Sequence, residues 1–267
     1  MFTDFDAFLR GQNLSDNTIT AYSFTVKDYY SREKDLSKRK LLSYKNYLME
    51  NFKPKTVNLR IQALNKYLDF ANQPKLKLKS VKVQQKTYLE NVISDADYTF
   101  LKNCLRTEQN REWYFIVRFL AATGARVGEL IQIKAEHVHK GYIDIYGKGV
   151  KYRRIFIPKR LRIETEEWLL QEGRKSGYLF VNRFGERITT RGVAHQLKCF
   201  AVKYGINPDV VYPHSFRHRF AKNFLEKYND ISLLADLMGH ESIETTRIYL
   251  RKTSLEQQTI VDRVVTW

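Results

Sequence analysis

Apolar residues recur at helical spacing along most of this chain. The first clear pattern begins at Ser15 or Asp16, either of which can cap a helix by accepting a backbone hydrogen bond. Residues spaced three or four apart then share one face, so the sequence predicts an amphipathic helix here. The apolar face of this helix is formed by Ile19, Tyr22, Val26 and Tyr29.

Two further helical patterns follow in the N-terminal part. One runs from about Leu36 to Met49, and the other begins at Pro54, a residue favoured in the first helical turn. The second helix has an apolar stripe and, opposite it, polar side chains of a kind that can reach base edges in a DNA groove. An ordinary solvated face is the alternative explanation. The candidate DNA-contacting residues on this face are Lys55, Asn58, Gln62, Asn65 and Lys66.

The helical pattern breaks between residues 73 and 87. This stretch contains five lysines and no acidic residue. We interpret residues 75–92 as a basic linker between two domains, able to follow a phosphate backbone, with Lys77 and Lys79 as candidate DNA contacts. A short edge strand is the alternative, because apolar residues alternate at Leu76, Leu78, Val81 and Val83.

The remainder of the chain mixes helical patterns with one strand-like pair. A helix capped by Ser94 and a helix over residues 111–122 come first. Residues 142–146 and 154–157 alternate like strands and flank a Gly-Lys-Gly turn, which predicts an antiparallel hairpin. Helical patterns resume over residues 161–171, 191–204, 215–227 and 231–238.

Together these patterns predict a mainly α fold with a small antiparallel β-sheet. We expect a helical domain over residues 1–74, the linker over 75–92 and a second domain over 93–267. No apolar run has the length of a membrane span, and the N-terminus lacks a signal-peptide pattern. Cys104 and Cys199 lack C-x-x-C spacing, so we expect reduced thiols and a cytoplasmic protein.

Net charge narrows the choice of partner. The chain has 46 Lys and Arg against 29 Asp and Glu, a formal charge of +17. Residues 1–91 carry +8 of this excess and residues 92–267 carry the other +9. Such an excess favours a polyanion, since neutralised phosphates release counterions. Charge alone does not separate DNA from RNA or an acidic membrane surface, but the even division favours two parts that both contact nucleic acid.

Four short motifs in the second domain contain candidate catalytic residues. They are T-G-A-R-V-G-E-L at 123–130, G-K-G at 147–149, H-S-F-R-H at 214–218, and L-M-G-H at 237–240 followed nine residues later by Tyr249. Each has an ordinary explanation when taken alone, such as an ion pair on one helical turn or a tight hairpin turn. Their order and spacing are far more specific than any one of them.

In that order the motifs resemble those of the tyrosine recombinases, also called phage integrases, a family that includes the Xer recombinases and Cre. The family pattern is an Arg in T-G-x-R-x-x-E-L, a Lys in a β-hairpin, H-x-x-R, L-G-H and a Tyr about nine residues further on. The resemblance spans residues 93–250. Residues 14–22 (L-S-x-N-T-I-x-A-Y) and the helix over 55–71 also resemble the family's core-binding domain. The resemblance implies a two-domain clamp around duplex DNA.

The resemblance also implies how the scissile phosphate is bound. In-line attack places negative charge on the non-bridging oxygens, which Arg126 and Arg217 would hold bidentately while remaining charged. His240 would add a hydrogen bond to the same phosphate. Glu129 would brace Arg126 without contacting substrate.

Two proton transfers complete the implied reaction. Tyr249, a phenol with a pKa of ~10, would give its proton to His214 and become esterified to the 3′-phosphate. Lys148 would protonate the leaving 5′-oxygen, with Lys151 as the alternative acid. For His218 we expect a structural or phosphate-contacting role. No carboxylate pair or Cys/His cluster has metal-ligand spacing, so we expect neither metal nor cofactor.

The C-terminal residues suggest an assembly. Ile260, Val261, Val264, Val265 and Trp267 form an apolar face on a predicted short helix. Packing on its own domain is the plain explanation, whereas the resemblance implies docking on a neighbouring subunit in a tetramer that exchanges strands through a Holliday junction on double-stranded DNA. The resemblance further implies a bacterial or mobile-element origin and leaves room for a partner recombinase. The competing functions are a type IB topoisomerase and a non-catalytic DNA-binding scaffold.

Overall fold

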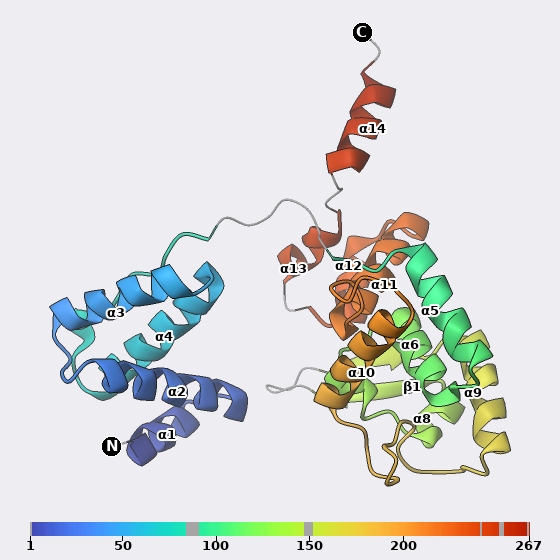
Figure 1. The fold of residues 1–267 in the computed structure, drawn as a ribbon, viewed down its shortest axis with the longest axis horizontal. Helices are drawn as coiled ribbons and strands as arrows, with labels where there is room; N and C mark the ends of the chain where they lie inside the picture. Colours follow the sequence, from blue (N-terminus) through green and yellow to red (C-terminus); the bar gives the residue numbers. More distant parts are fainter. Residues whose placement is uncertain (1, 84–90, 147–151, 241, 251–253, 266) are drawn as a thin grey trace. The chain divides into compact units, whose positions relative to one another are not determined.

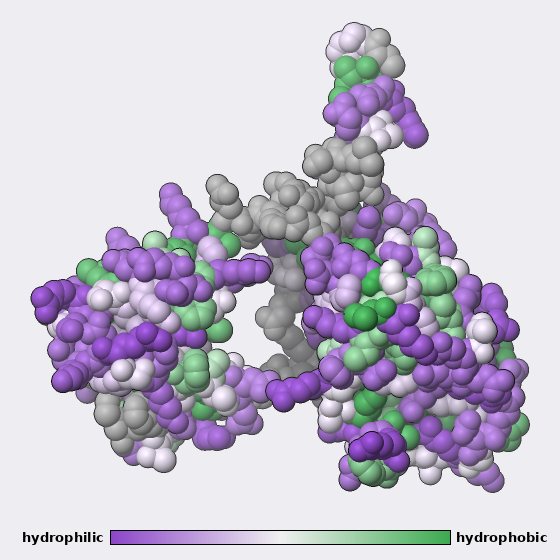
Figure 2. Space-filling model, viewed as in Figure 1, coloured by the Kyte–Doolittle hydropathy of each residue, from purple (hydrophilic) through white to green (hydrophobic). Residues whose placement is uncertain are grey.

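The computed structural model describes residues 2–83, 91–146, 152–240, 242–250, 254–265 and 267. The chain divides into two compact units, residues 1–85 and residues 86–267. Hydrophilic side chains cover most of the visible face of each unit (Figure 2). None of the described helices is long and apolar enough to cross a membrane.

The N-terminal unit is a bundle of helices whose apolar stripes meet in its core. The predicted helices are present, and Ser15 caps the first of them by accepting from the Thr18 backbone N–H at 3.2 Å. A short helix over Phe2–Gly11, which the pattern did not reveal, precedes them. The helices are α1 (Phe2–Gly11), α2 (Asp16–Arg32), α3 (Lys38–Asn51) and α4 (Pro54–Phe70).

The first part of the predicted basic linker packs on this unit as far as Val81. A single 3₁₀ turn, η1 (Pro74–Leu76), is followed by backbone without strand pairing, so the edge-strand alternative is wrong for the described part. Leu78 is buried, and the Asn65 side chain holds its backbone at both N–H and C=O, at 2.8 and 2.9 Å. Asn58 does the same for Val81, at 2.8 and 3.0 Å.

These contacts correct part of the predicted DNA-contacting face of α4. The amides of Asn58 and Asn65 are used to hold the chain's own backbone, so we assign them a structural role in place of base recognition. Lys66 donates to the Gln12 side chain at 2.7 Å, and Lys77 pairs with Asp69 at 2.7 Å. The exposed candidates Lys55, Gln62 and Lys79 stay predictions.

The second unit is mainly helical with one two-stranded antiparallel sheet (Figure 1). Ser94 caps its first helix, as predicted, by accepting from the Asp97 backbone N–H at 3.0 Å. The strands pair from Tyr142↔Phe156 to Tyr146↔Tyr152. The elements are α5 (Asp95–Thr107), α6 (Arg111–Thr123), α7 (Val127–Leu130), α8 (Ala135–Lys140), β1 (Tyr142–Tyr146), β2 (Tyr152–Phe156), α9 (Lys159–Gln171), α10 (Thr190–Lys203), α11 (Pro213–Lys227), α12 (Ile231–Met238), α13 (Ile243–Arg247), η2 (Ile248–Leu250) and α14 (Ser254–Val264).

Helix α6 is the central element of this unit. It packs against α5, α9 and α11, and its apolar residues from Phe115 to Leu120 are buried in the main core. A second, smaller cluster joins α11, α12 and η2 around Leu234, Met238 and Tyr249. Tyr249, the last of the motif residues, therefore belongs to this second cluster.

Candidate active site

Four separate segments bring motif residues together in the second unit. Arg126 lies at the start of α7, Arg217 in the first turns of α11, His240 just beyond α12, and Tyr249 in η2. Packing of α11 against α6, α12 and η2 brings these segments together. Lys148 and Lys151 lie outside the described residues, so their predicted role stays a prediction.

Three backbone carbonyls at the C-terminal end of α12 each accept a hydrogen bond from an arginine. Arg153 Nη1 donates to Leu237 O at 2.7 Å, Arg217 Nη2 to Met238 O at 2.6 Å, and Arg126 Nη2 to Gly239 O at 3.2 Å. Carbonyls in the last turn of a helix lack partners within the helix and carry its negative dipole end. One helix terminus therefore fixes and partly neutralises guanidinium groups from three other segments.

Glu129 links two of these arginines. Its carboxylate accepts from Arg126 Nη1 at 3.0 Å and from the Arg126 backbone N–H at 2.7 Å. It also accepts from Arg153 Nη2 at 2.5 Å. The predicted pairing of Glu129 with Arg126 is present, and the carboxylate holds the hairpin strand β2 as well.

Arg153 is the site residue that the sequence did not reveal. The predicted strand began one residue later, at Arg154, and Arg153 was given no role, yet its side chain is 9% exposed and lies against the turn after α12. A Cβ on Gly239 would come within 2.4 Å of Arg153 Cδ, and Gly239 also has φ +59°, so glycine is required there. The only sequence signal was the glycine of the L-M-G-H motif, which indicates that another group packs closely against the backbone there but does not identify it.

Arg217 is held inside the unit. It is 3% exposed, and it donates to Gly124 O as well as to Met238 O and His240 Nε2, the last at 3.1 Å. Burial, followed by the positive charges of Arg126 and Arg153, lowers the pKa of Arg217 to about 10. It therefore remains charged at neutral pH. The two carbonyls and His240 engage three of its five N–H groups, and Arg217 is also hydrogen-bonded to the Tyr249 side chain, the proposed nucleophile.

His240 is fixed through both ring nitrogens. Nε2 accepts from Arg217, so the proton lies on Nδ1, which is 2.7 Å from the buried Thr246 hydroxyl. Burial, and then the neighbouring Arg217, lower the pKa of His240 to about 4. The imidazole is thus neutral, and its ring lies nearly parallel to that of Tyr249, with centroids 6.3 Å apart.

The hydrogen-bond partner of Tyr249 differs from the predicted one. Tyr249 is 6% exposed, and its hydroxyl lies 3.1 Å from Nδ1 of His218 rather than from His214. Both histidines lie on one face of α11, one turn apart, with ring centroids separated by 6.4 Å. Because η2 packs against the second of these turns, His218 is the residue that meets the tyrosine.

The electrostatics of this pair favour a proton held on the tyrosine at rest. Burial raises the pKa of Tyr249 despite the opposing effect of Arg217. Burial also lowers the pKa of His218 to about 4, with further lowering by His214 and Arg217. The His218 imidazole is therefore neutral at neutral pH, and in the tautomer protonated on Nε2 its Nδ1 accepts from the Tyr249 hydroxyl. No group of three or more His, Cys, Asp or Glu residues in the described ranges could hold a metal ion.

Comparison with known proteins gives relatives over nearly the whole chain. The model of the phage integrase family matches residues 92–256. Tyrosine recombinase XerA of Pyrococcus furiosus is 30% identical over 269 residues, covering 97% of this chain and 92% of the relative.

Two solved structures share the fold. The XerH recombinase bound to its difH substrate has a TM-score of 0.70 at 21% identity, covering 94% of this chain and 80% of that one. A lambda integrase tetramer bound to a Holliday junction has a TM-score of 0.74 at 14% identity, covering 95% and 78%. The predicted mainly α fold with a small antiparallel sheet is confirmed.

Proposed function

Because this chain belongs to the phage integrase family of tyrosine recombinases, enzymes of site-specific recombination that cleave and rejoin DNA, we propose that Tyr249 cuts one strand and holds it as a 3′-phosphotyrosine. The observation that carries the proposal is the hydrogen bond between the buried Tyr249 hydroxyl and His218, beside Arg217. A nicked suicide substrate tests it. An adduct that survives denaturation is the expected result, whereas tight DNA binding without an adduct would contradict it.

The arginines supply the stabilisation of the transition state. As the phosphorane forms, charge grows on the non-bridging oxygens, and donors already in place stabilise it without reorganisation. The Arg126 side chain is 42% exposed and so can reach a bound phosphate, while Arg217 presents its remaining donors from within the unit. By analogy with oxyanion-hole donors, each is expected to contribute ~3 kcal/mol.

Each bond that breaks is matched by one that forms. The Tyr249 oxygen attacks phosphorus as its proton passes to His218 Nδ1, and the bond from phosphorus to the 5′-oxygen breaks. The 5′-oxygen then takes a proton, for which we propose Lys148 on the strength of the motif alone. A free 5′-hydroxyl can reverse the attack, so the energy of the phosphodiester is conserved and ATP is not needed.

Replacing His218 with glutamine is expected to slow cleavage about 100-fold, the lower range for a general base. The pH dependence should also steepen. Without an acceptor only the phenolate reacts, and its fraction rises about tenfold per pH unit below the raised pKa of Tyr249. Single-turnover cleavage of a suicide substrate between about pH 7 and about pH 9 measures both effects.

His214→Gln is the matched comparison for this variant, since it alters the other histidine on the same face of α11. It is expected to keep the shallow pH profile of the unaltered protein. A steep profile in His214→Gln together with an unchanged one in His218→Gln would restore His214 as the acceptor.

We further propose that α14 docks on a neighbouring copy, giving a tetramer that exchanges strands through a Holliday junction. Val261 and Trp267 are 52% and 91% exposed, so this apolar face is not covered by its own unit. If α14 of each copy binds the next copy through the same heterologous interface, the assembly closes into a ring. The lambda integrase structure of this fold is a tetramer on a Holliday junction, which supports the proposal.

Removing residues 256–267 is expected to leave binding to a single half-site within about twofold but to weaken cooperative binding to a two-arm site at least about tenfold, or about 1.4 kcal/mol. The apolar face would be lost from the interface while the DNA-contacting units stay intact. Gel-shift titrations on the two DNAs measure this. The double substitution V261S and V264S is the milder control, and unchanged cooperativity in both proteins would contradict the tetramer contact.

A further inference from the structure

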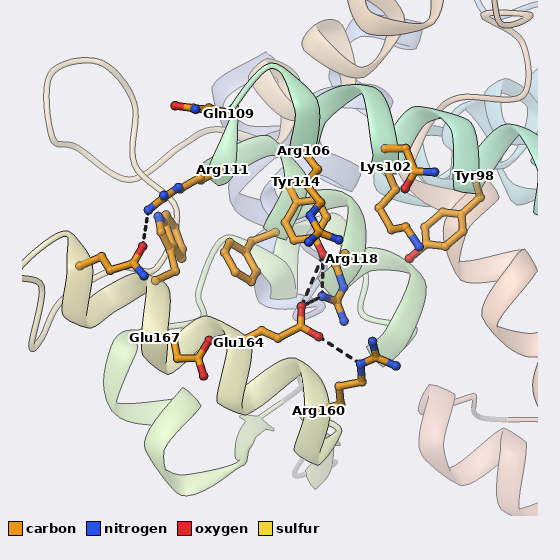
Figure 3. Close-up of a pocket in the computed structure, with 14 residues that line it drawn as sticks. Tyr98, Lys102, Arg106, Gln109, Arg111, Tyr114, Arg118, Arg160, Glu164 and Glu167 are labelled. Atoms are coloured by element: carbon orange, nitrogen blue, oxygen red, sulfur yellow. Dashed lines mark hydrogen bonds and ion pairs between the residues drawn. The ribbon is translucent and has the colours of Figure 1, made fainter.

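A cavity of 720 Å³ lies in the second unit, away from the candidate active site. Helices α5, α6 and α9 enclose it (Figure 3). In Figure 1, α5 and α9 form one side of this unit and α13 lies on the other. The cavity is therefore a separate concave site that the proposed reaction does not use.

Positive charge dominates the lining of this cavity. Five cationic side chains face two carboxylates, a balance of +3 for the lining. A recessed surface of one sign concentrates field and attracts counter-ions more strongly than a flat one. The cations are Lys102, Arg106, Arg111, Arg118 and Arg160, and the carboxylates are Glu164 and Glu167.

The carboxylate of Glu164 is an anionic group that the cations of the cavity already bind. Glu164 is paired with Arg118 and with Arg160, the second at 3.2 Å, and the Tyr114 hydroxyl lies 3.4 Å from it (Figure 3). These contacts join α6 to α9 and account for two of the five cations. Arg111 is also engaged, by the side chain of Gln171.

Lys102 and Arg106 have no such partner. Neither forms a hydrogen bond or ion pair within the part of the chain that the structure describes, and Lys102 Nζ lies 5.6 Å from the centroid of the Tyr98 ring. Burial, and then a set of arginines led by Arg118, lower the pKa of Lys102. A half-buried ammonium among like charges is unfavourable unless an anion joins it.

Two aromatic side chains among the lining residues stack on each other. Phe115 and Trp168 are both buried and stack with ring centroids 4.7 Å apart. The volume of the cavity is in the usual range for a small-molecule site, and its mainly polar lining favours a charged ligand over an apolar one.

We propose that this cavity binds the phosphate groups of a nucleotide-sized ligand, with Lys102 and Arg106 as the contacting cations. Phosphate supplies the strongly charged acceptor oxygens that these two unpaired donors lack. Phosphate oxygens of this kind are present both in a free polyphosphate and in the DNA backbone. The experiments below distinguish these two ligands.

Trp168 offers a local probe. In the full chain carrying W113F and W267F, Trp168 is the remaining tryptophan, so its fluorescence reports the cavity and not the arginines of the active site. Titration with inorganic pyrophosphate at low salt is expected to give a saturable change with a midpoint below about 1 mM. Adding K102Q and R106Q should raise the midpoint at least about tenfold. Adding K175Q and R191Q instead, which removes the same charge from exposed positions, should leave it within about twofold.

A second arm identifies the source of the phosphate. Binding of a 40-bp duplex is measured against salt for the unaltered protein and for the K102Q and R106Q variant. If the DNA backbone occupies the cavity, the slope of log affinity against log salt becomes shallower by about 1.8, or 0.9 per lost contact. An unchanged slope with a shifted pyrophosphate midpoint assigns the site to a free ligand. No saturable pyrophosphate signal, or equal midpoints in the K102Q and R106Q protein and its control, would overturn the proposal.

Discussion

Replacing Tyr249 with phenylalanine is expected to abolish the covalent protein–DNA complex while leaving DNA binding intact. The phenol oxygen is the atom that we propose to attack phosphorus, and no other group replaces it. The aromatic ring, by contrast, packs in the cluster of α11, α12 and η2, and phenylalanine preserves that packing. Loss of the hydrogen bond to His218 is expected to lower the free energy of unfolding by only about 1–2 kcal/mol.

The measurement is a denaturing gel of protein incubated with a nicked suicide substrate. Tyr228→Phe is the matched control because Tyr228 is 58% exposed at the end of α11. It should form the adduct as well as the unaltered protein does. An adduct that persists in Tyr249→Phe would mean that another residue is the nucleophile, and the proposed mechanism would be wrong.

Replacing Arg217 with lysine is expected to slow cleavage about 1000-fold although the charge is kept. Lysine offers one compact ammonium in place of a planar group that holds two carbonyls and His240 at once. The carbonyls of Gly124 and Met238 would lose charged donors, so the free energy of unfolding should also fall by about 2 kcal/mol.

Single-turnover cleavage, duplex binding and urea unfolding of Arg217→Lys separate these effects. Unfolding data show whether the variant is folded in the assay, and duplex binding shows whether the DNA is still held. Arg219→Gln is the control on the same helix, because Arg219 pairs with Asp95 at 2.6 Å and stacks on Tyr98, away from the site. If Arg217→Lys cleaved DNA within about threefold of the rate of the unaltered protein, the proposed role of the Arg217 guanidinium in stabilising the transition state would be wrong.

Much of the local structure was predictable because it depends on neighbours in the chain. The helical period marks α2 and α4, and Ser15 and Ser94 cap their helices through backbone groups three residues away. The pairing of β1 with β2 follows from alternation on both sides of a Gly-Lys-Gly sequence. The family, too, was evident from the order of motifs, which is a property of the sequence alone.

Only the tertiary structure decided which side chains meet. His214 and His218 share a face of α11, and the packing of η2 alone selects His218 for Tyr249. Arg153 joins the site because β2 lies against the end of α12, 84 residues further along the chain. Asn58 and Asn65, which a helical pattern placed toward DNA, instead hold the returning backbone at Val81 and Leu78.

The physical reason is the range of the interactions. Helix period, caps and turns arise between residues a few positions apart, so the sequence by itself determined the elements and, through motif order, the family. The partner of a buried polar group is fixed by whichever distant segment packs beside it, since burial without a hydrogen bond is costly. The hydrogen-bond partners of Tyr249 and Arg217, and the pairing of Glu129 with Arg153, were therefore decided by tertiary packing and could not be predicted from the sequence.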